Sequence, residues 1–230
     1  MYQPHSTVVK CQNFACIREQ SFMATRCSGS WDEPKLAVCL VGFVRTLPFE
    51  QVFKSIATAF RPPVDFYGVV AVGDGEHDTA KGQWHVVSRK ELAPALAYLR
   101  PVAWNDSSLL ETQLPPACGL SCMRQFERLE QCAALIRAHE QACGERYTWV
   151  VKARPDVRFG GGPAPSLSQL RNNTVYKDTA AGDMVVYIPR DALDNISRAL
   201  GGDLRGSRHC HQGLHTGIKC EVNGTGPGCK

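Results

Sequence analysis

Residues 36–46 read Leu-Ala-Val-Cys-Leu-Val-Gly-Phe-Val-Arg-Thr, and they carry the clearest indication of the fold class. The first six residues form a continuous apolar run that Gly42 ends, which is typical of a strand buried on both faces of a parallel sheet. Apolar residues then recur at helical spacing over residues 49–60, and the proline pair at 62–63 closes this segment. A second apolar run covers residues 64–72. The predicted order at the start of the domain is therefore strand, helix, strand.

Strands and helices continue to alternate along the rest of the sequence. Apolar runs predict further strands at residues 102–104, 147–153, 175–176 and 184–188. Helical periodicity predicts helices over residues 89–99, 121–143 and 191–200. Ser88 is placed to cap the first of these helices, and Gly144 is placed to end the second. This alternation predicts an α/β fold with a mostly parallel central sheet.

We expect one α/β domain over residues 34–204 with an extension at each end. Residues 1–33 contain cysteines and are polar and turn-rich, without a sustained hydrophobic period. Residues 205–230 form a tail rich in Cys, His and Gly. The spacing of its histidines and cysteines fits no standard zinc pattern, so we interpret the tail as a segment tied by disulfides. The alternative is that one of its histidines completes a metal site elsewhere.

Composition and charge limit the classes of function. The chain has 230 residues, of which 43% are hydrophobic and 21% charged, as in an ordinary globular domain. Its 26 basic and 22 acidic side chains give a net charge of +4, and the basic residues are scattered, so we expect no nucleic-acid partner. No apolar run approaches the ~18 residues of a membrane span, which predicts no transmembrane segment in this chain. Residues 1–10 also lack the pattern of an export signal.

The cysteines indicate an oxidising compartment. Eleven cysteines in 230 residues are dense for a reducing compartment, and an odd number leaves at least one outside intramolecular disulfides. Cys39 and Cys132 have a second interpretation, as small buried apolar residues without a disulfide. Four glycosylation sequons in polar or turn-like stretches agree with an oxidising location; they begin at Asn105, Asn172, Asn195 and Asn223. We therefore expect a protein of the secretory pathway, in the lumen of the Golgi or endoplasmic reticulum.

Polar residues gather in the loops that follow two of the predicted strands. Gly42, Arg45 and Thr46 follow the strand predicted at residues 36–41. The strand predicted at residues 147–153 leads into Lys152-Ala-Arg154-Pro-Asp156. Ligands of open α/β sheets bind at the carboxyl ends of the strands, and arginine forks suit phosphate oxygens. Asp156 is the natural partner for a divalent cation such as Mn²⁺ or Mg²⁺. The alternative is a turn held by an ion pair between Arg154 and Asp156.

Residues 38–46, 125–140 and 147–156 together resemble an uncharacterised glycosyltransferase-like family of plants and algae, whose members are similar to GT-A nucleotide-sugar transferases. The family pattern is a first strand ending in Gly-x-x-Arg-Thr, a helix with a Gln and a late Glu, and a strand leading into Arg-x-Arg-x-Asp. This chain has Lys152 in place of the first of those arginines. The resemblance spans about residues 36–200.

The resemblance implies a GT-A-like fold, a three-layer α/β/α sandwich that binds a nucleotide sugar. It implies cofactor or donor binding by Gly42, Arg45, Thr46, Lys152 and Arg154. Asp156 stands where a metal-binding carboxylate of the GT-A Asp-x-Asp motif would lie, and Arg154 occupies the position of the first Asp.

The segment from Lys177 to Met184 resembles the acceptor-side loop of the family. Asp178 and Asp183 in this loop are the candidate catalytic bases, because an inverting transferase needs a carboxylate to take the proton of the acceptor hydroxyl. The alternative is that both are solvated loop residues or helix caps.

Two functions are consistent with these residues. The first is a glycosyltransferase that moves a sugar from a nucleotide-sugar donor to a glycan or glycoprotein acceptor, assisted by a metal ion. The second is a luminal or secreted binding module on the same fold, without catalysis. A third interpretation is a cytosolic protein that binds a phosphorylated small molecule. The sequence has no Walker-type phosphate loop, no dinucleotide Gly-x-Gly-x-x-Gly and no Gly-x-Ser-x-Gly elbow, which makes ATPases, dinucleotide oxidoreductases and α/β-hydrolases poor candidates.

Overall fold

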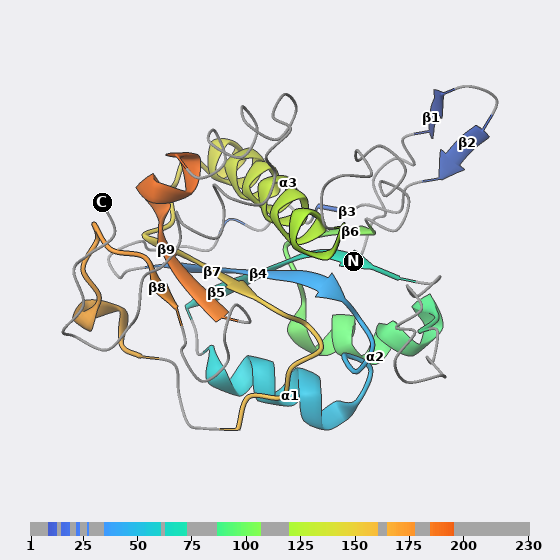
Figure 1. Cartoon of the computed structure of the whole chain (residues 1–230), viewed down its shortest axis with the longest axis horizontal. Helices are drawn as coiled ribbons and strands as arrows, with labels where there is room; N and C mark the ends of the chain where they lie inside the picture. Colours follow the sequence, from blue (N-terminus) through green and yellow to red (C-terminus); the bar gives the residue numbers. More distant parts are fainter. Residues whose placement is uncertain are drawn as a thin grey trace.

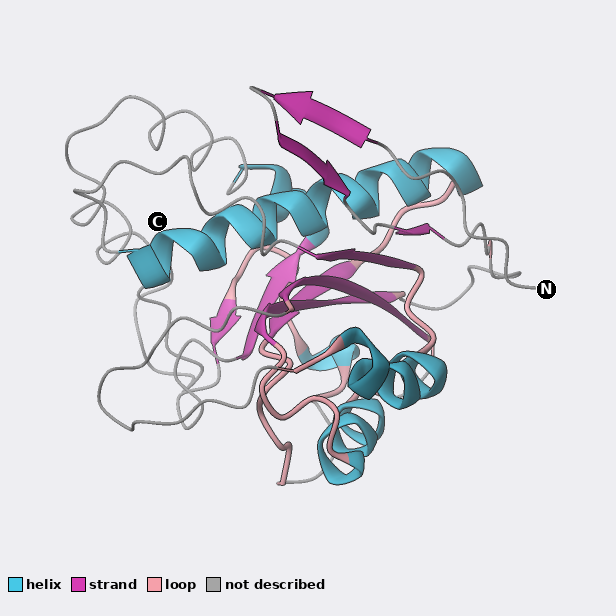
Figure 2. Cartoon of the chain, turned by 90° about the vertical axis from the view of Figure 1, so that its right-hand side faces the viewer, coloured by secondary structure: helices cyan, strands magenta, loops and turns pink. Residues whose placement is uncertain are grey.

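The fold has three layers, with helices on both faces of a central sheet. A computed structural model describes residues 9–12, 15–18, 22–23, 27, 35–60, 63–72, 87–106, 120–160, 165–177 and 185–195. Helix α3 (Leu120–Cys143) covers one face of the sheet, and α1 (Glu50–Ala59) and α2 (Arg89–Leu99) cover the other (Figures 1 and 2). The α/β class and the arrangement of layers expected from the sequence are therefore confirmed.

The sheet has seven strands in the order β3-β6-β5-β4-β7-β9-β8. Four of them are parallel neighbours at its centre: β6 (Ala103–Asp106), β5 (Val64–Ala71), β4 (Leu36–Phe43) and β7 (Trp149–Ala153). The edges are antiparallel: β3 (Phe22–Met23), β9 (Val185–Pro189) and β8 (Tyr176–Lys177). The centre is thus parallel as predicted, and the sheet as a whole is mixed.

Two hydrophobic cores follow from the alternation of side chains along the central strands. Val38 and Leu40 of β4 pack with residues of α1 and α2, whereas Cys39 and Val41 pack with residues of α3. Successive side chains of a strand point to opposite faces, so a strand between two helical layers needs apolar residues at every position. This explains why residues 36–41 have no polar alternation.

The local signals at helix ends are confirmed. The hydroxyl of Ser88 accepts a hydrogen bond from the backbone of Glu91, and the Glu91 carboxylate in turn accepts one from the backbone of Ser88, so the two residues form a capping box. Ala142, in the last turn of α3, is exposed although it is apolar. In the last turns of this helix, His139 and Cys143 lie toward the interior instead.

Among the residues that the structure describes, two disulfides tie α3 to the rest of the chain. Cys39 of β4 is bonded to Cys132 of α3, and both are fully buried. The interpretation of these two residues as unbonded apolar side chains is therefore wrong. Cys27 is bonded to Cys143 at the end of α3, and β3 pairs with β6, so two segments of residues 1–33 contact the domain. Strands β1 (Val9–Gln12) and β2 (Ala15–Arg18) form a separate antiparallel pair.

The described sequons differ in their surroundings. Asn105 lies in strand β6, not in a turn, and its amide donates a hydrogen bond to Gln131 of α3. Asn172 and Asn195 are exposed. Asn223 lies outside the described residues.

Across the described ranges, no helix combines the length and the apolar composition that a membrane crossing requires.

Candidate functional site

The direction of the connections changes at the centre of the sheet. From β4 the chain proceeds through β5 to β6 on one side, with α1 and α2 on one face. It then returns through α3, on the opposite face, to β7 on the other side of β4. Such a reversal is a topological switch point, and ligands of open α/β sheets bind there, beyond the carboxyl ends of the strands. The switch point lies between β4 and β7, the two strands whose following loops carry the predicted site residues.

The chain segments at the ends of β4 and β7 lie in direct contact. The Thr46 hydroxyl donates a hydrogen bond to the carbonyl of Asp156, at 2.9 Å. Gly42 has a φ of +134°, and a Cβ placed on it would lie 3.6 Å from Cδ of Pro155. Gly42 lies near the end of β4, paired with Val70 of β5, and a positive φ of this kind is favourable only for glycine. The structure therefore places Thr46 against Asp156 and Gly42 beside Pro155.

Arg154 and Asp156 form a bidentate ion pair. Nε of Arg154 lies 2.9 Å from Oδ1 of Asp156, and Nη2 lies 2.8 Å from Oδ2. The Asp156 side chain is 8% exposed. The observed arrangement is thus the turn held by an Arg–Asp pair, which the sequence analysis left as an alternative.

The described donor atoms do not fit a divalent cation. Both carboxylate oxygens of Asp156 accept hydrogen bonds from Arg154, so a metal ion would have to displace the guanidinium. Among the described residues, no cluster of three or more His, Cys, Asp and Glu side chains is suited to hold a metal ion. Asp178, Asp183 and the histidines of the C-terminal tail lie outside the described residues.

Lys152 lies within β7 rather than in the loop after it, and its side chain is 6% exposed. It pairs in register with Cys39 of β4, whose side chain is bonded to α3. Cross-strand partners point to the same face of a sheet, so Lys152 faces α3. Its ammonium group therefore adds positive charge beneath α3, near the carboxyl end of the strand.

Two arginines contact one aromatic ring at the end of β4. Cζ of Arg45 lies 4.8 Å from the ring centroid of Phe43, and Cζ of Arg128 lies 5.0 Å from it. Both distances are within the range of cation–π contact. The two guanidinium carbons are therefore less than about 10 Å apart. Arg128 comes from α3 and is 3% exposed.

Sequence reasoning missed Arg128, because it assigned the arginines of this helix to the polar, solvent-facing side. A signal was nonetheless present. Arg128 precedes Cys132 by four residues, and positions so related share one face of a helix. That face is the buried one, with Leu129 and Ile136. We call Arg45, Arg128, Lys152 and Arg154 the basic cluster below.

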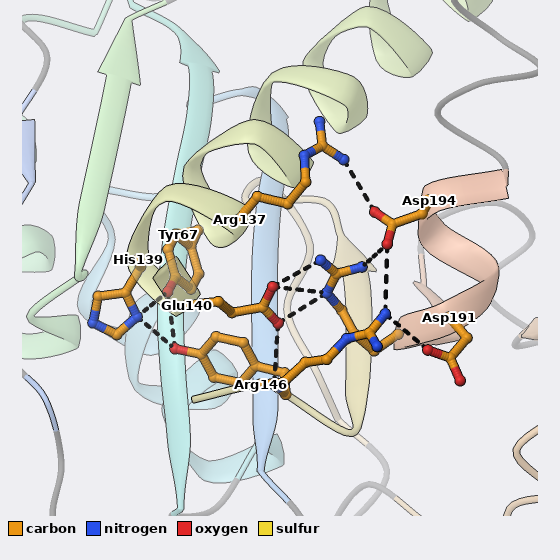
Figure 3. Close-up of polar contacts among 9 residues, drawn as sticks. Tyr67, Arg137, His139, Glu140, Arg146, Asp191 and Asp194 are labelled. Atoms are coloured by element: carbon orange, nitrogen blue, oxygen red, sulfur yellow. Dashed lines mark hydrogen bonds and ion pairs between the residues drawn. The ribbon is translucent and has the colours of Figure 1, made fainter. Parts of the chain in front are cut away.

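A polar network lies at the amino ends of the parallel strands, at the opposite end of the sheet from the switch point (Figure 3). Glu140 of α3 accepts hydrogen bonds from Nε and Nη2 of Arg190, which follows β9, and from the backbone N–H of Tyr147. Asp194 in turn contacts Arg190 and Arg137. Glu140 is the late glutamate of the resemblance, and its contacts connect three elements instead of facing the loops of the switch point.

The same network continues into a buried group of hydroxyls. The Tyr67 and Tyr147 hydroxyls lie 2.8 Å apart, both are hydrogen-bonded to Nδ1 of His139, and Tyr147 donates to Asp65. Burial raises the pKa of both tyrosines, so they remain protonated donors. Burial alone would raise the pKa of Asp194, but the hydrogen bonds and charges of Arg190 and Arg137 outweigh this effect and lower it. These residues stabilise the fold, because ligands of this topology bind at the other edge.

No protein-family model, no curated protein and no solved structure matches the chain. Inference about its function therefore depends on the residues and the geometry described above.

Proposed function

We propose that the protein is a GT-A-like glycosyltransferase, which moves a sugar from a nucleotide-sugar donor to a glycan or glycoprotein acceptor in the lumen of the Golgi or endoplasmic reticulum. The observation that carries the proposal is the contact between the two loops at the switch point, with the basic cluster around them. The Cys39–Cys132 and Cys27–Cys143 disulfides support an oxidising compartment.

The chemistry of sugar transfer explains why cationic side chains belong in this position. The leaving group is a nucleoside diphosphate, and negative charge develops on it as its bond to the sugar breaks. Fixed cations beside that charge stabilise the transition state more than the ground state, which is how they accelerate the reaction. Arg45 contributes a guanidinium group, and such groups contact phosphate oxygens in a bidentate manner. Arg154 is already paired with both carboxylate oxygens of Asp156.

The acceptor hydroxyl needs a base, and Asp178 and Asp183 are the proposed residues. Either carboxylate would take the proton as the acceptor oxygen forms its bond to the anomeric carbon of the sugar. A variant without the base should keep its affinity for the donor and lose turnover, because the base contributes only in the chemical step.

One observation favours a second function, a binding module without catalysis. Asp156 is fully engaged by Arg154 and is thereby unlike a carboxylate that awaits a metal ion. A decayed transferase site could keep its affinity for phosphate and lack the chemistry.

The first experiment measures the thermal midpoint of the purified chain with a panel of nucleoside diphosphates and nucleotide sugars. A ligand that binds only the folded state stabilises it by about 2.7 kcal/mol at a hundredfold excess over Kd. We expect one base to raise the midpoint, and Arg45→Gln to reduce that shift. Arg171→Gln, which changes an exposed arginine beside β8, is the matched control.

Turnover then separates the two functions. Release of nucleoside diphosphate from the stabilising nucleotide sugar, lost in Asp178→Asn or Asp183→Asn with the midpoint shift retained, supports the transferase. A shift without turnover over a range of acceptors supports the binding module. If no nucleotide changes the midpoint, both functions are wrong.

A further inference from the structure

We infer that the protein binds the diphosphate of its donor through the guanidinium groups of Arg45 and Arg128, which both contact the Phe43 ring, without a divalent cation. The inference rests on the proposed function and specifies how the donor is recognised. It assigns a binding role to Arg128, a helix residue remote in sequence from both loops of the switch point.

The carboxylate that would hold a metal ion already has a partner. Arg154 satisfies both oxygens of Asp156 at 2.8 and 2.9 Å, in the fork geometry that makes such pairs strong. The Asp156 side chain is also largely buried, where loss of one partner leaves a poorly solvated charge. Binding a cation here would therefore require breaking this pair first.

Arg45 and Arg128, which both contact Phe43, provide positive charge without a metal ion. Arg45 belongs to the loop after β4 and is half-buried, and Arg128 comes from α3 and is almost wholly buried. Their contacts with the same ring place both guanidinium groups at the carboxyl end of β4. A separation of less than about 10 Å between their carbons allows one polyanion to contact both groups.

The position of Arg128 favours affinity for an anion. A buried arginine has lost its conformational freedom on folding, so little further entropy is lost when a phosphate binds. Its charge is also little screened by water. Lys152, which faces α3 from the neighbouring strand, adds to the positive potential on this side of the sheet.

Guanidinium groups can replace a divalent metal cation in the transfer step itself. The bond between the anomeric carbon and the diphosphate oxygen breaks, and its electron pair departs with the diphosphate. The acceptor oxygen forms the new bond, and its proton passes to the carboxylate base. The diphosphate therefore gains one negative charge, which Arg45 and Arg128 neutralise because arginine remains protonated at all physiological pH values.

The test measures the affinity of the stabilising nucleoside diphosphate by calorimetry, once in EDTA and once in MnCl₂. We expect the same Kd in both buffers. Arg45→Gln and Arg128→Gln should each weaken binding at least tenfold, and Arg171→Gln should leave it unchanged. Asp156→Asn should still bind in EDTA, because it releases the Arg154 guanidinium and removes no proposed contact.

A further variant covers the case in which Arg128→Gln does not fold. Arg128→Lys keeps the charge and loses the fork, so it should fold, as checked by circular dichroism, and bind more weakly. Binding that requires Mn²⁺ and is lost in Asp156→Asn overturns this inference while the proposed function stands. Full affinity in both Arg45→Gln and Arg128→Lys overturns it as well. If no nucleoside diphosphate binds in either buffer, the proposed function itself fails.

Discussion

At the scale of single residues, Gly42 shows how backbone geometry permits the site. Its φ of +134° is a conformation that residues with a Cβ rarely adopt, and it occurs at the point where the loop after β4 meets the loop after β7. Gly42 also has no Cβ on the side that faces Pro155. A Cβ here would be in ordinary van der Waals contact with Pro155, so its cost lies in the backbone conformation.

We therefore expect Gly42→Ala to lower the free energy of unfolding by about 1–3 kcal/mol, the range for a residue held in a disfavoured backbone conformation. It should also weaken nucleoside diphosphate binding, because the loop must change its path. Urea denaturation and calorimetry measure the two effects. Gly160→Ala is the control, since a Cβ there meets nothing within 4 Å, and equal stability losses in the two variants would show that the turn at Gly42 is unimportant.

At the scale of secondary-structure elements, the Glu140–Arg190 pair connects α3 to the strand at the antiparallel side of the sheet. Three hydrogen bonds of 2.7 to 3.1 Å join the two side chains, which are 10% and 5% exposed. Glu140 also accepts from the backbone N–H of Tyr147, just before β7. One carboxylate thus positions the end of a helix against two neighbouring strands.

We expect Glu140→Gln to destabilise the fold by about 3 kcal/mol, because it leaves the buried charge of Arg190 short of a partner. Lys54→Gln breaks the exposed Glu50–Lys54 pair on α1 and should change stability much less, because water screens this pair. Chemical denaturation of the two variants compares these costs directly. A cost for Glu140→Gln as small as that for Lys54→Gln would show that Glu140 is not the connection between these elements.

The elements were predictable from the sequence, and their long-range contacts were not. Apolar runs and helical periodicity predict β4, α1 and β5, because burial on both faces of a strand or on one face of a helix leaves a local pattern. The Ser88 cap is local as well. Glu140 and Arg190 are 50 residues apart, and no local pattern relates them. For the same reason the sequence predicted the loops of Arg45 and Arg154 but not the approach of Arg128 from α3.

At the scale of the whole molecule, disulfides hold α3 at two separate points among the described residues. Cys39–Cys132 joins the helix to the central strand, and Cys27–Cys143 joins the end of the helix to a segment before the domain. Their sequence separations are 93 and 116 residues. Loop-closure entropy depends only logarithmically on such lengths, so the two bonds should contribute similarly through the unfolded state.

We expect the variant with Cys39→Ala and Cys132→Ala to lose more stability than the variant with Cys27→Ser and Cys143→Ser. Each loses about 4.7 kcal/mol of loop-closure stabilisation by the chain-entropy estimate. The first also leaves a cavity, because both of its cysteines are fully buried, whereas Cys27 is exposed. Urea denaturation ranks them, and the reverse order would contradict the burial argument.

The pairing of β4 with β7 also determines when, during synthesis of the chain, the site can form. Leu36 pairs with Val64 on one side and with Trp149 on the other. The second pairing therefore waits until more than a hundred residues beyond Leu36 have left the ribosome. Distant pairings of this kind form slowly, since a long loop must close first. A nascent chain can thus complete the strand–helix–strand unit of β4, α1 and β5 long before the loop after β7 reaches Thr46. Nucleotide binding would then report the pairing of β4 with β7, and an assay of it would count only molecules that have completed the parallel centre of the sheet.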